Sequence, residues 1–272
     1  MGLDIQIVQK HLAYRSVARD IHVYGAVAST NAVLRTLAAN GASGGTVVIA
    51  DEQTEGRGRH GKPWFSPPGV NLYLSALFRP NITTRSAGGF SFVGSLALCD
   101  AIGGEGLEAT IKWPNDVLVE GKKVAGVLAE CATVETHIDY VMLGFGVNLN
   151  VTHKTLMTEL GPSGHFAGSL ADLAGREIDR NAFAAALLNH LFRWVATYRT
   201  DGPTAVVAAW RDRDILTGRR VEVRGEGSSY EGRVLGVDTQ GCLLVRDSLG
   251  EVHRVLAGEI RLSDLEDGEE RA

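Results

Sequence analysis

The sequence has little cysteine, little lysine and no long apolar run. Its three cysteines, Cys99, Cys131 and Cys242, lie far apart without a CxxC pair, so we expect a reducing compartment and neither a disulfide framework nor a zinc site. The first twenty residues carry charges throughout and lack the apolar core of a secretory signal. The most apolar predicted helix, Phe183 to Tyr198, contains a histidine and an arginine, which indicates a core helix and not a membrane span. These absences predict a cytoplasmic protein without a membrane partner.

Basic residues are also in the minority, with 27 Lys and Arg against 32 Asp and Glu. A protein that covers duplex phosphates is usually basic, so DNA is not expected as a partner, although a local basic site stays open. The contents of 44% hydrophobic and 22% charged residues are ordinary for a globular chain. A length of 272 residues predicts a large domain with a small one, or two of similar size.

Helical and strand patterns alternate up to Asp214, which predicts an α+β or α/β domain over residues 1–214. The expected helices follow the Ser29-Thr30-Asn31 cap up to Gly41 and cover Ser91–Ile102 and Ala182–Tyr198. The expected strands are Thr46–Ala50, Val70–Phe78, Val117–Glu120, Val124–Glu130 and Tyr140–Leu149. Because the turns between the last three are short, we expect a mixed, largely antiparallel sheet and not a doubly wound parallel one.

The helical period disappears after Asp214. Four short strands follow, separated by glycine-containing turns, over Val221–Val223, Gly232–Val237, Cys242–Val245 and Val252–Leu256. Four or five strands in about 50 residues fit a small closed barrel. We therefore predict a β-barrel domain over residues 215–266 and a frayed acidic tail over residues 267–272.

A glycine-rich segment, Gly56-Arg57-Gly58-Arg59-His60-Gly61, matches the G-x-G-x-x-G dinucleotide fingerprint. That fingerprint needs a following helix, which Pro63 and Pro67-Pro68 block, and an acidic residue about 20 positions later. The sequence has no Asp or Glu between Glu55 and Asp100. The dinucleotide interpretation fails, and two candidates stay open: a loop that wraps an anion with its two guanidinium groups, or a solvated turn.

Lysine is rare enough for its positions to carry information. The chain has six Lys against 21 Arg, and four lie near the candidate site, at Lys62, Lys112, Lys122 and Lys123; coincidence is the alternative.

In Lys112-Trp113-Pro114-Asn115-Asp116, the proline forces Trp113 out of the helical region, so we expect a sharp turn at a strand end. Asn-Asp is often only a turn former, but beside phosphates an Asp can bind Mg²⁺ or orient an amine nucleophile. In the next segment, Gly126 inside a predicted strand suggests close approach by a ligand.

Taken together, the segments resemble a biotin protein ligase. The resemblance rests on motifs in the family's order, listed here: Ser29-Thr30-Asn31, Gln53-Thr54, Gly56–Gly61 with Trp64, Lys112–Asp116, Lys123–Glu130, and Gly144-Phe145-Gly146-Val147-Asn148. It implies the family's class II synthetase-like biotin/lipoate ligase fold with an SH3-like C-terminal barrel. It also implies a two-step reaction, in which biotin and MgATP give biotinyl-5′-AMP and a lysine of a biotin carboxyl carrier protein, as in acetyl-CoA carboxylase, then takes the biotin.

The resemblance assigns a role to each motif. The catalytic candidates it implies are Lys123, Arg57, Arg59 and Asp116. The biotin-binding candidates are Ser29, Thr30, Asn31, Gln53, Gly56, Arg57, Gly58, Arg59, Lys123 and Gly126. The ATP-binding candidates are Arg59, Lys62, Trp64, Lys112, Asn115, Asp116 and Asn148, with Asp116 also the candidate Mg²⁺ ligand. Two have plain structural alternatives: Trp64 as a core aromatic residue and Asn148 as a strand-end cap.

Two departures from the family and two alternatives complete the prediction. The resemblance covers roughly Val23 to Asn150, and a first strand is expected near Val23; the 22 residues before it are too few for the helix-turn-helix of the family's longer members, so repressor function is not expected. Lys62 stands where many members have Arg. The alternatives are a lipoate or octanoate ligase, and a non-catalytic module that binds biotin or nucleotide; Lys123 and the two loop arginines argue against the second.

Overall fold

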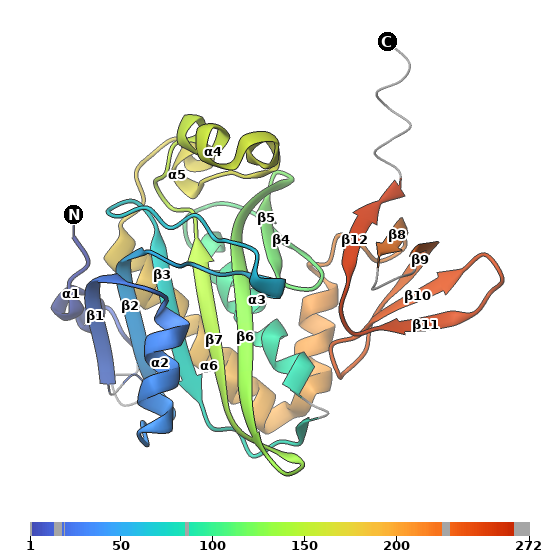
Figure 1. Cartoon of the computed structure of the whole chain (residues 1–272), viewed down its shortest axis with the longest axis horizontal. Helices are drawn as coiled ribbons and strands as arrows, with labels where there is room; N and C mark the ends of the chain where they lie inside the picture. Colours follow the sequence, from blue (N-terminus) through green and yellow to red (C-terminus); the bar gives the residue numbers. More distant parts are fainter. Residues whose placement is uncertain (1, 14–17, 19, 85–86, 225–228, 264–272) are drawn as a thin grey trace.

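A seven-stranded sheet forms the larger part of the protein (Figure 1). This computed structural model describes residues 2–13, 18, 20–84, 87–224 and 229–263. The strands are β1 Asp20–Val27, β2 Thr46–Gln53, β3 Leu72–Phe78, β4 Ala109–Lys112, β5 Asp116–Val119, β6 Lys122–Val134 and β7 His137–Val147, in the spatial order β1-β2-β3-β7-β6-β5-β4. The β1–β2 pair is parallel and the other pairs are antiparallel. The predicted mixed, largely antiparallel sheet is confirmed.

Helices cover both faces of this sheet. Behind it in Figure 1 lie α3 Ala87–Gly103 and α6 Arg180–Arg211, and in front of it lies α2 Thr30–Ala39. Because α3 is apolar on nearly all sides, it is sandwiched between the sheet and α6, with residues such as Phe92 and Leu96 fully buried. The α2 helix buries only one stripe, which includes Leu34. It begins after Ser29 and ends at Asn40, where Gly41 adopts a φ of 88°.

Several elements differ from the sequence prediction. The last long helix continues past Tyr198 to Arg211, across a break where Gly202 has a φ of 78° and Pro203 follows. A break of this kind hides the second segment from a periodicity argument because it shifts the helical register. The prediction gave no bounds for several elements: α1 Ile5–Lys10, β1, the 3₁₀ turn η1 Arg59–Gly61, β4, α4 His153–Leu160, the 3₁₀ turn η3 Gly161–Phe166, α5 Leu170–Ala174 and β12 Glu259–Leu262.

The C-terminal strands form a separate five-stranded antiparallel sheet. Its strands are β8 Arg220–Arg224, β9 Ser229–Val237, β10 Leu243–Asp247, β11 Val252–Val255 and β12, in the order β11-β10-β9-β8-β12. Buried valines such as Val221, Val234 and Val245 form its core. Within residues 220–224 and 229–262 no β11–β12 pairing closes this sheet into the expected barrel. The domain boundary near Ile215 stays a prediction, and the predicted tail lies outside the described residues.

The two sheets are joined through the end of α6 and through β4. The Ile111 amide donates to the Arg213 carbonyl at 2.8 Å, and the Ile215 amide donates back to the Ile111 carbonyl at 3.0 Å. Trp210 of α6 is fully buried and stacks on Phe92 of α3, with ring centroids 4.6 Å apart. These contacts fix the C-terminal sheet beside the turn between β4 and β5, where the predicted site begins.

Candidate active site

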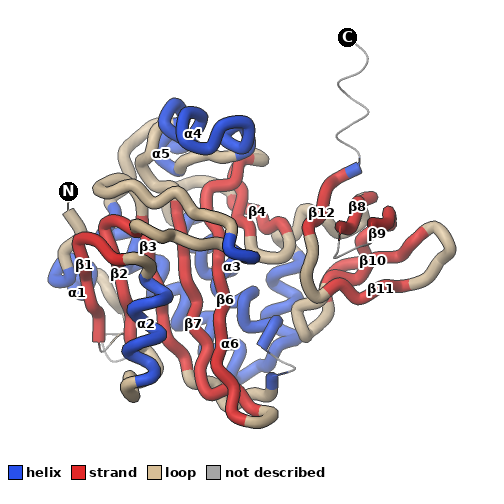
Figure 2. Tube along the Cα trace, in the orientation of Figure 1, coloured by secondary structure: helices blue, strands red, loops and turns tan. Residues whose placement is uncertain are grey.

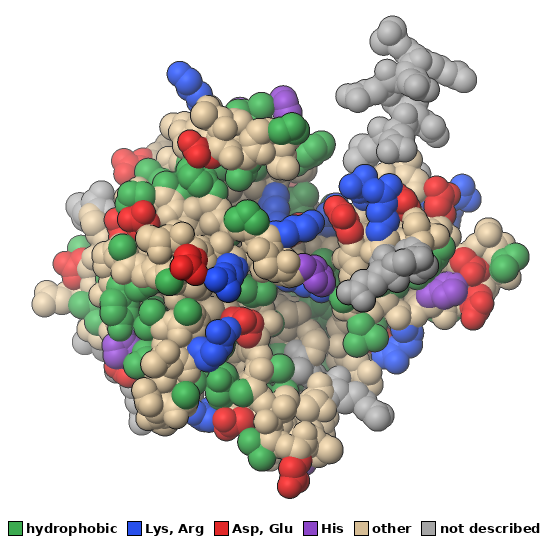
Figure 3. Space-filling model, in the orientation of Figure 1, with side chains coloured by type: hydrophobic (Ala, Val, Ile, Leu, Met, Phe, Trp, Pro, Cys, Tyr) green, Lys and Arg blue, Asp and Glu red, His purple; other side chains and the backbone are tan. Residues whose placement is uncertain are grey.

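The candidate residues converge on the front face of the large sheet. Figure 1 and Figure 2 show the loop between β2 and β3 crossing in front of β7 and β6, beside the start of α2. The loop carries the glycine-rich segment and Trp64, and Lys123 is the second residue of β6. Figure 3 shows Lys and Arg side chains around the hollow between the large and the small sheet on this face.

A buried polar network surrounds the start of α2. The Gln53 Oε1 atom accepts from the Thr30 amide at 2.9 Å and from its hydroxyl at 3.1 Å. The Ser75 hydroxyl lies 2.7 Å from Thr30 Oγ1 and 2.6 Å from Asn31 Oδ1. The Asn31 Nδ2 group donates to Glu130 Oε2 at 2.6 Å. With donor and acceptor sides both engaged, the amide of Asn31 is held in one orientation.

This network opens into a small pocket of about 130 Å³. The lining residues are Ala28, Ser29, Asn31, Ala32, Arg35, Glu55, Arg57, Leu128 and Glu130. Three predicted biotin-binding residues, Ser29, Asn31 and Arg57, are among them. The pocket also contains Glu130, which the sequence prediction missed and which pairs with Arg35 at 2.7 Å. It combines apolar walls with a few oriented polar groups, the composition typical of a small-molecule site.

The glycine-rich segment is a tight hairpin that contains the 3₁₀ turn η1 Arg59–Gly61, and it does not open an α-helix. The Gly58 amide donates to the Lys62 carbonyl at 2.7 Å, and the Trp64 amide donates to the Gly56 carbonyl at 2.9 Å. A Cβ on Gly56 would lie 2.5 Å from Ser66 Oγ, so only glycine fits there. Arg57 is 64% exposed and pairs at 2.9 Å with Glu55, which belongs to the same loop. Its guanidinium therefore stands at the pocket mouth without an anchor on the sheet.

Trp64 lies across two glycines of the sheet. A Cβ on Gly146 of β7 would collide with the indole Nε1, and one on Gly126 of β6 would lie 3.4 Å from Cζ3. The close approach that we expected at Gly126 is therefore made by the Trp64 side chain, and Gly146 is the tighter of the two. The Lys123 ammonium lies 5.3 Å from the centre of this ring. The Trp64 Nε1 is buried without a hydrogen-bond partner in the described structure, so the indole has a donor to offer at the site.

Gly144 of β7 leaves room for the Asn31 side chain, as Gly146 does for Trp64. A Cβ at Gly144 would collide with Asn31 Oδ1. Gly144 and Gly146 are two residues apart in β7 and face the same side of the sheet, where the first leaves room for Asn31 and the second for Trp64. Interior strand glycines are a signal for such close approaches, and the sequence prediction applied it only at Gly126.

Lys123 and Asp116 form an ion pair at the centre of the site. Lys123 Nζ lies 2.6 Å from Asp116 Oδ1, and the two side chains are 37% and 29% exposed. Asp116 follows the turn Trp113–Asn115, and the Asn115 Nδ2 group ties that turn to the Val127 carbonyl of β6 at 2.7 Å. The sharp turn predicted before Asp116 is present, and it brings together two catalytic candidates from different strands.

Arg59 lies beside the same turn. Its guanidinium carbon is 5.9 Å from the centre of the Trp113 ring. Burial lowers the pKa of Arg59, an effect that the carboxylate of Asp116 opposes. The cations Arg59 and Lys123 therefore flank one carboxylate, an arrangement with positive charge left over for an anionic ligand.

The remaining candidates lie at the edges of this arrangement. Lys62 is exposed, and Lys112 is half-buried at the end of β4, opposite Asp116 in the strand register. Asn148 is buried, and its Nδ2 group donates to the Gly168 carbonyl at 3.0 Å, a contact of the kind expected for a strand-end cap. Lys122 donates to the His165 carbonyl at 2.5 Å, so it is tied to η3 and directed away from the Lys123–Asp116 pair.

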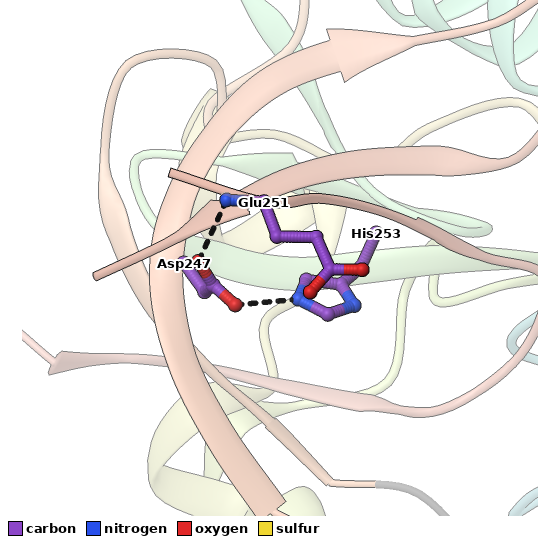
Figure 4. Close-up of side chains that lie close together, drawn as sticks. All are labelled: Asp247, Glu251 and His253. Carbon is purple, nitrogen blue, oxygen red and sulfur yellow. Dashed lines mark hydrogen bonds and ion pairs between the residues drawn. The ribbon is translucent and has the colours of Figure 1, made fainter. Parts of the chain in front are cut away.

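A second cluster of ionisable side chains lies on the small sheet. Asp247, Glu251 and His253 are the one group within the described ranges whose ligand atoms, all within 4.8 Å, could hold a metal ion (Figure 4). Asp247 Oδ1 accepts from the backbone amides of Leu249 and Glu251, each at 2.9 Å. The Oδ2 atom lies 2.7 Å from His253 Nε2. Both oxygens of the Asp247 carboxylate therefore already have hydrogen-bond partners in the cluster. These hydrogen bonds hold the β10–β11 turn together.

Comparison with known proteins follows the same division of the chain. Residues 24–148 match the biotin/lipoate A/B protein ligase family, and residues 216–263 match the biotin protein ligase C-terminal domain. Among the helices in the described ranges, none has the length and hydrophobicity that a membrane span requires.

Individual relatives cover most of the chain. It is 36% identical over 225 residues to the biotin–[acetyl-CoA-carboxylase] ligase of Paracoccus denitrificans, covering 82% of this chain and 92% of the relative. The corresponding ligase of Mycobacterium tuberculosis is 35% identical, with 89% and 88% covered. The biotin protein ligase of Aquifex aeolicus in complex with biotin and ATP superposes with a TM-score of 0.74 at 26% identity, over 90% of this chain and 100% of that one. The protein is therefore an enzyme of the ligase class. The chain belongs to the biotin protein ligase family, as the motifs predicted.

Proposed function

We propose that the protein activates biotin with ATP to biotinyl-5′-AMP and transfers the biotin to a lysine of a biotin carboxyl carrier domain. The observation that carries this proposal is the junction of the oriented Asn31 network and pocket with the Arg59–Asp116–Lys123 cluster on one face. The Asn31 network and pocket suit a small polar ring, and the Arg59–Asp116–Lys123 cluster suits an anhydride that carries phosphate charge. The matches to the two ligase families and the relatives named for carboxylase ligation support the same reaction.

In the first step a carboxylate oxygen of biotin attacks the α-phosphorus of ATP, and pyrophosphate leaves. Lys123 and Arg59 are the cations that we assign to the charge shared by the carboxylate and the α-phosphate. The free-energy cost of breaking the Lys123–Asp116 ion pair is smaller when phosphate oxygens replace the carboxylate as partners of the Lys123 ammonium. Arg57, at the pocket mouth, would close on the adenylate from the solvent side.

Further assignments follow from position in the site. Thr30, Asn31, Ser29 and Gln53 are assigned to the ureido ring, because Asn31 and Gln53 already present fixed donors and acceptors. Trp64 is assigned to the wall of the adenylate pocket. On the biotin side, the remaining assignments are the loop glycines Gly56 and Gly58 and Gly126 of β6. On the nucleotide side, they are Lys62, Lys112, Asn115 and Asn148.

Mg²⁺ enters with ATP, and Asp116 fits it as a protein ligand. Mg²⁺ prefers oxygen ligands and is often held by one or two carboxylates plus the substrate phosphates. Asp116 is the carboxylate that pairs with Lys123, one of the cations assigned to the α-phosphate. The metal would neutralise charge on the leaving pyrophosphate.

In the second step the acceptor amine attacks the carbonyl carbon of the anhydride, AMP leaves, and the amine loses a proton. Asp116 can orient the amine or take that proton. We expect Asp116→Asn, which keeps the shape and removes the charge, to slow transfer from preformed biotinyl-adenylate in single-turnover measurements. A wild-type transfer rate from preformed adenylate in this variant would remove Asp116 from the second step.

The reaction itself is tested by pyrophosphate exchange into ATP, with biotin or lipoate as the acid. Exchange that depends on biotin supports the proposal, and mass spectrometry of an added carrier domain then detects transfer to its lysine. Exchange with lipoate alone would point to the lipoate ligase alternative. Exchange with neither acid would point to the non-catalytic alternative.

A further inference from the structure

The turn between β9 and β10 of the small sheet contacts the catalytic turn directly. The carbonyl of Gly241 accepts a hydrogen bond from the Trp113 indole Nε1 at 3.0 Å. Trp113 is 2% exposed, so this is a buried contact between the two sheets. Residues 238–242, here the clamp turn, therefore touch the segment that leads into Asn115 and Asp116.

The clamp turn is held rigid by one carboxylate. Asp238 Oδ1 accepts from the backbone amides of Gln240 at 2.9 Å and Cys242 at 3.0 Å. Asp238 Oδ2 accepts two hydrogen bonds from Arg254, at 2.9 and 2.6 Å, and Arg254 also donates to Gln240 Oε1 at 2.9 Å. Although burial opposes it, these hydrogen bonds lower the pKa of Asp238. The paired geometry fixes where the Gly241 carbonyl points.

The clamp turn also rests on the first turn of α3 without intervening side chains. A Cβ on Gly88 would collide with the Gln240 carbonyl oxygen, and one on Gly89 would lie 2.8 Å from the Thr239 carbonyl oxygen. A Cβ on Gly241 would lie 2.6 Å from the Gly88 carbonyl carbon, and Gly241 has a φ of 88°. Backbone therefore meets backbone, a contact that leaves little freedom to shift.

On its other side Trp113 meets the nucleotide half of the proposed site. Arg59 lies over the indole ring, and Asp116 comes three residues after Trp113. The contacts of the Asn31 network run to Gln53, Ser75 and Glu130, on strands β2, β3 and β6 of the large sheet. The clamp turn is thus placed to act on one half of the site and not on the other.

We infer that Asp238 is a positioning residue for adenylation: through the clamp turn and Trp113 it sets Arg59 and the Asn115–Asp116 turn for the nucleotide. This inference rests on the proposed function. It predicts that loosening the clamp turn weakens use of ATP much more than binding of biotin, because in the described structure the Asn31 network and its pocket have no contact with the clamp turn and Arg59 is only one of the residues assigned to biotin. A merely structural residue would affect both substrates or neither.

The chain offers a matched control in the next turn of the same sheet. Asp247 likewise accepts two backbone amides on Oδ1 and binds a basic side chain, His253, through Oδ2. Its turn joins β10 to β11 at the other end of β10. Asp238→Asn and Asp247→Asn therefore remove the same charge from the same kind of turn, and only the first turn touches Trp113.

The test measures biotin-dependent pyrophosphate exchange on the full chain. We expect Asp238→Asn and Trp113→Phe each to raise the KM for ATP about tenfold, with the Kd for biotin changed less than about twofold. Arg254→Gln, a second way to loosen the turn, should act in the same direction. Asp247→Asn should leave both constants unchanged. The double variant of Asp238 and Trp113 should be no worse than the stronger single variant, because both act through one hydrogen bond.

A nuclear magnetic resonance measurement provides a readout besides activity. The indole N–H signal of Trp113, assigned by its loss in Trp113→Phe, should shift in Asp238→Asn and stay in place in Asp247→Asn. Equal effects of the two Asp variants on ATP use, additive effects in the double variant, or an equal loss of biotin affinity would overturn the inference. If the wild type exchanges no pyrophosphate, the proposed reaction fails, and the indole signal still decides whether Asp238 holds Trp113.

Discussion

At the scale of single residues, two glycines of β7 set the shape of the site. Gly146 admits the Trp64 indole and Gly144 admits the Asn31 amide, so each glycine is matched to one partner far away in the sequence. The sequence pattern identified the motif and its glycines. It could not identify their partners, because contacts such as Asn31 with Glu130 join residues 99 positions apart and depend on the whole sheet.

Adding a methyl group at Gly146 tests this matching. Gly146→Ala should displace the Trp64 ring and reduce adenylation about a hundredfold, since small misplacements in an active site carry costs of this order. Gly126→Ala should have a much smaller effect, because its Cβ would only touch the ring at 3.4 Å. Pyrophosphate exchange measures both variants, and circular dichroism verifies their fold. Equal losses in the two variants would contradict the assignment of Gly146.

The neighbouring lysines provide a second matched pair. Lys123 faces Asp116 and Trp64, whereas Lys122 donates to the His165 carbonyl. Lys123→Ala should therefore reduce adenylation about a hundredfold or more, as expected for loss of about 3 kcal/mol of transition-state stabilisation. Lys122→Ala should be mild. Steady-state exchange kinetics compare the two, and similar losses would mean that the strand register at β6 does not separate their functions.

At the scale of elements, the prediction succeeded for the strands of the hairpin and for the long helices, and it failed for the short helical segments. The α2 helix, the β5–β6 hairpin and β7 lie where the sequence places them, because caps, alternation and glycine turns act locally. The short elements α4, η3 and α5 were missed, since five to eight residues offer too few repeats of a period. They are held by tertiary contacts, such as the bond of Asn148 to the Gly168 carbonyl.

The glycine-rich loop gives the prediction at this scale. Residues 55–62 have no apolar side chain to pack on the sheet, and Arg57 pairs within the loop, so local opening should be cheap. Hydrogen exchange across this loop should fall when biotin and ATP are added together, while the β10–β11 turn stays unchanged. Arg57→Gly should release activated biotin and label lysines indiscriminately. Unchanged exchange on ligand addition, or a variant that is merely inactive, would argue against closure of the loop over the adenylate.

At the scale of the whole molecule, the arrangement of the two sheets depends on the junction after α6. Composition and pattern predicted two textures and their order along the chain. They could not predict how the sheets meet, because the contacts at Ile111, Trp113 and Trp210 are made by buried residues that the sequence marks only as apolar or aromatic. The junction also contains a half-buried carboxylate, Asp214.

Asp214 makes the stability of this junction depend on pH. Burial raises the pKa of Asp214 above its ordinary value of 3.8, against the opposing hydrogen bonds from Leu216 and Thr217. A raised pKa means that the folded protein holds this proton more tightly than the unfolded chain does. The stabilisation that results is fully present below pH 3.8 and is lost as the pH rises through the raised pKa.

Asp214→Asn does not titrate, so it should not show this loss. The difference in thermal midpoint between Asp214→Asn and the wild type should therefore shift in favour of the variant as the pH rises above about 4, and then level off. Asp212→Asn removes an exposed carboxylate two residues earlier and controls for the change in net charge. Thermal unfolding from acidic to neutral pH measures all three proteins. If the midpoints of Asp214→Asn and the wild type run parallel across that range, the half-buried charge of Asp214 does not control the stability of the protein.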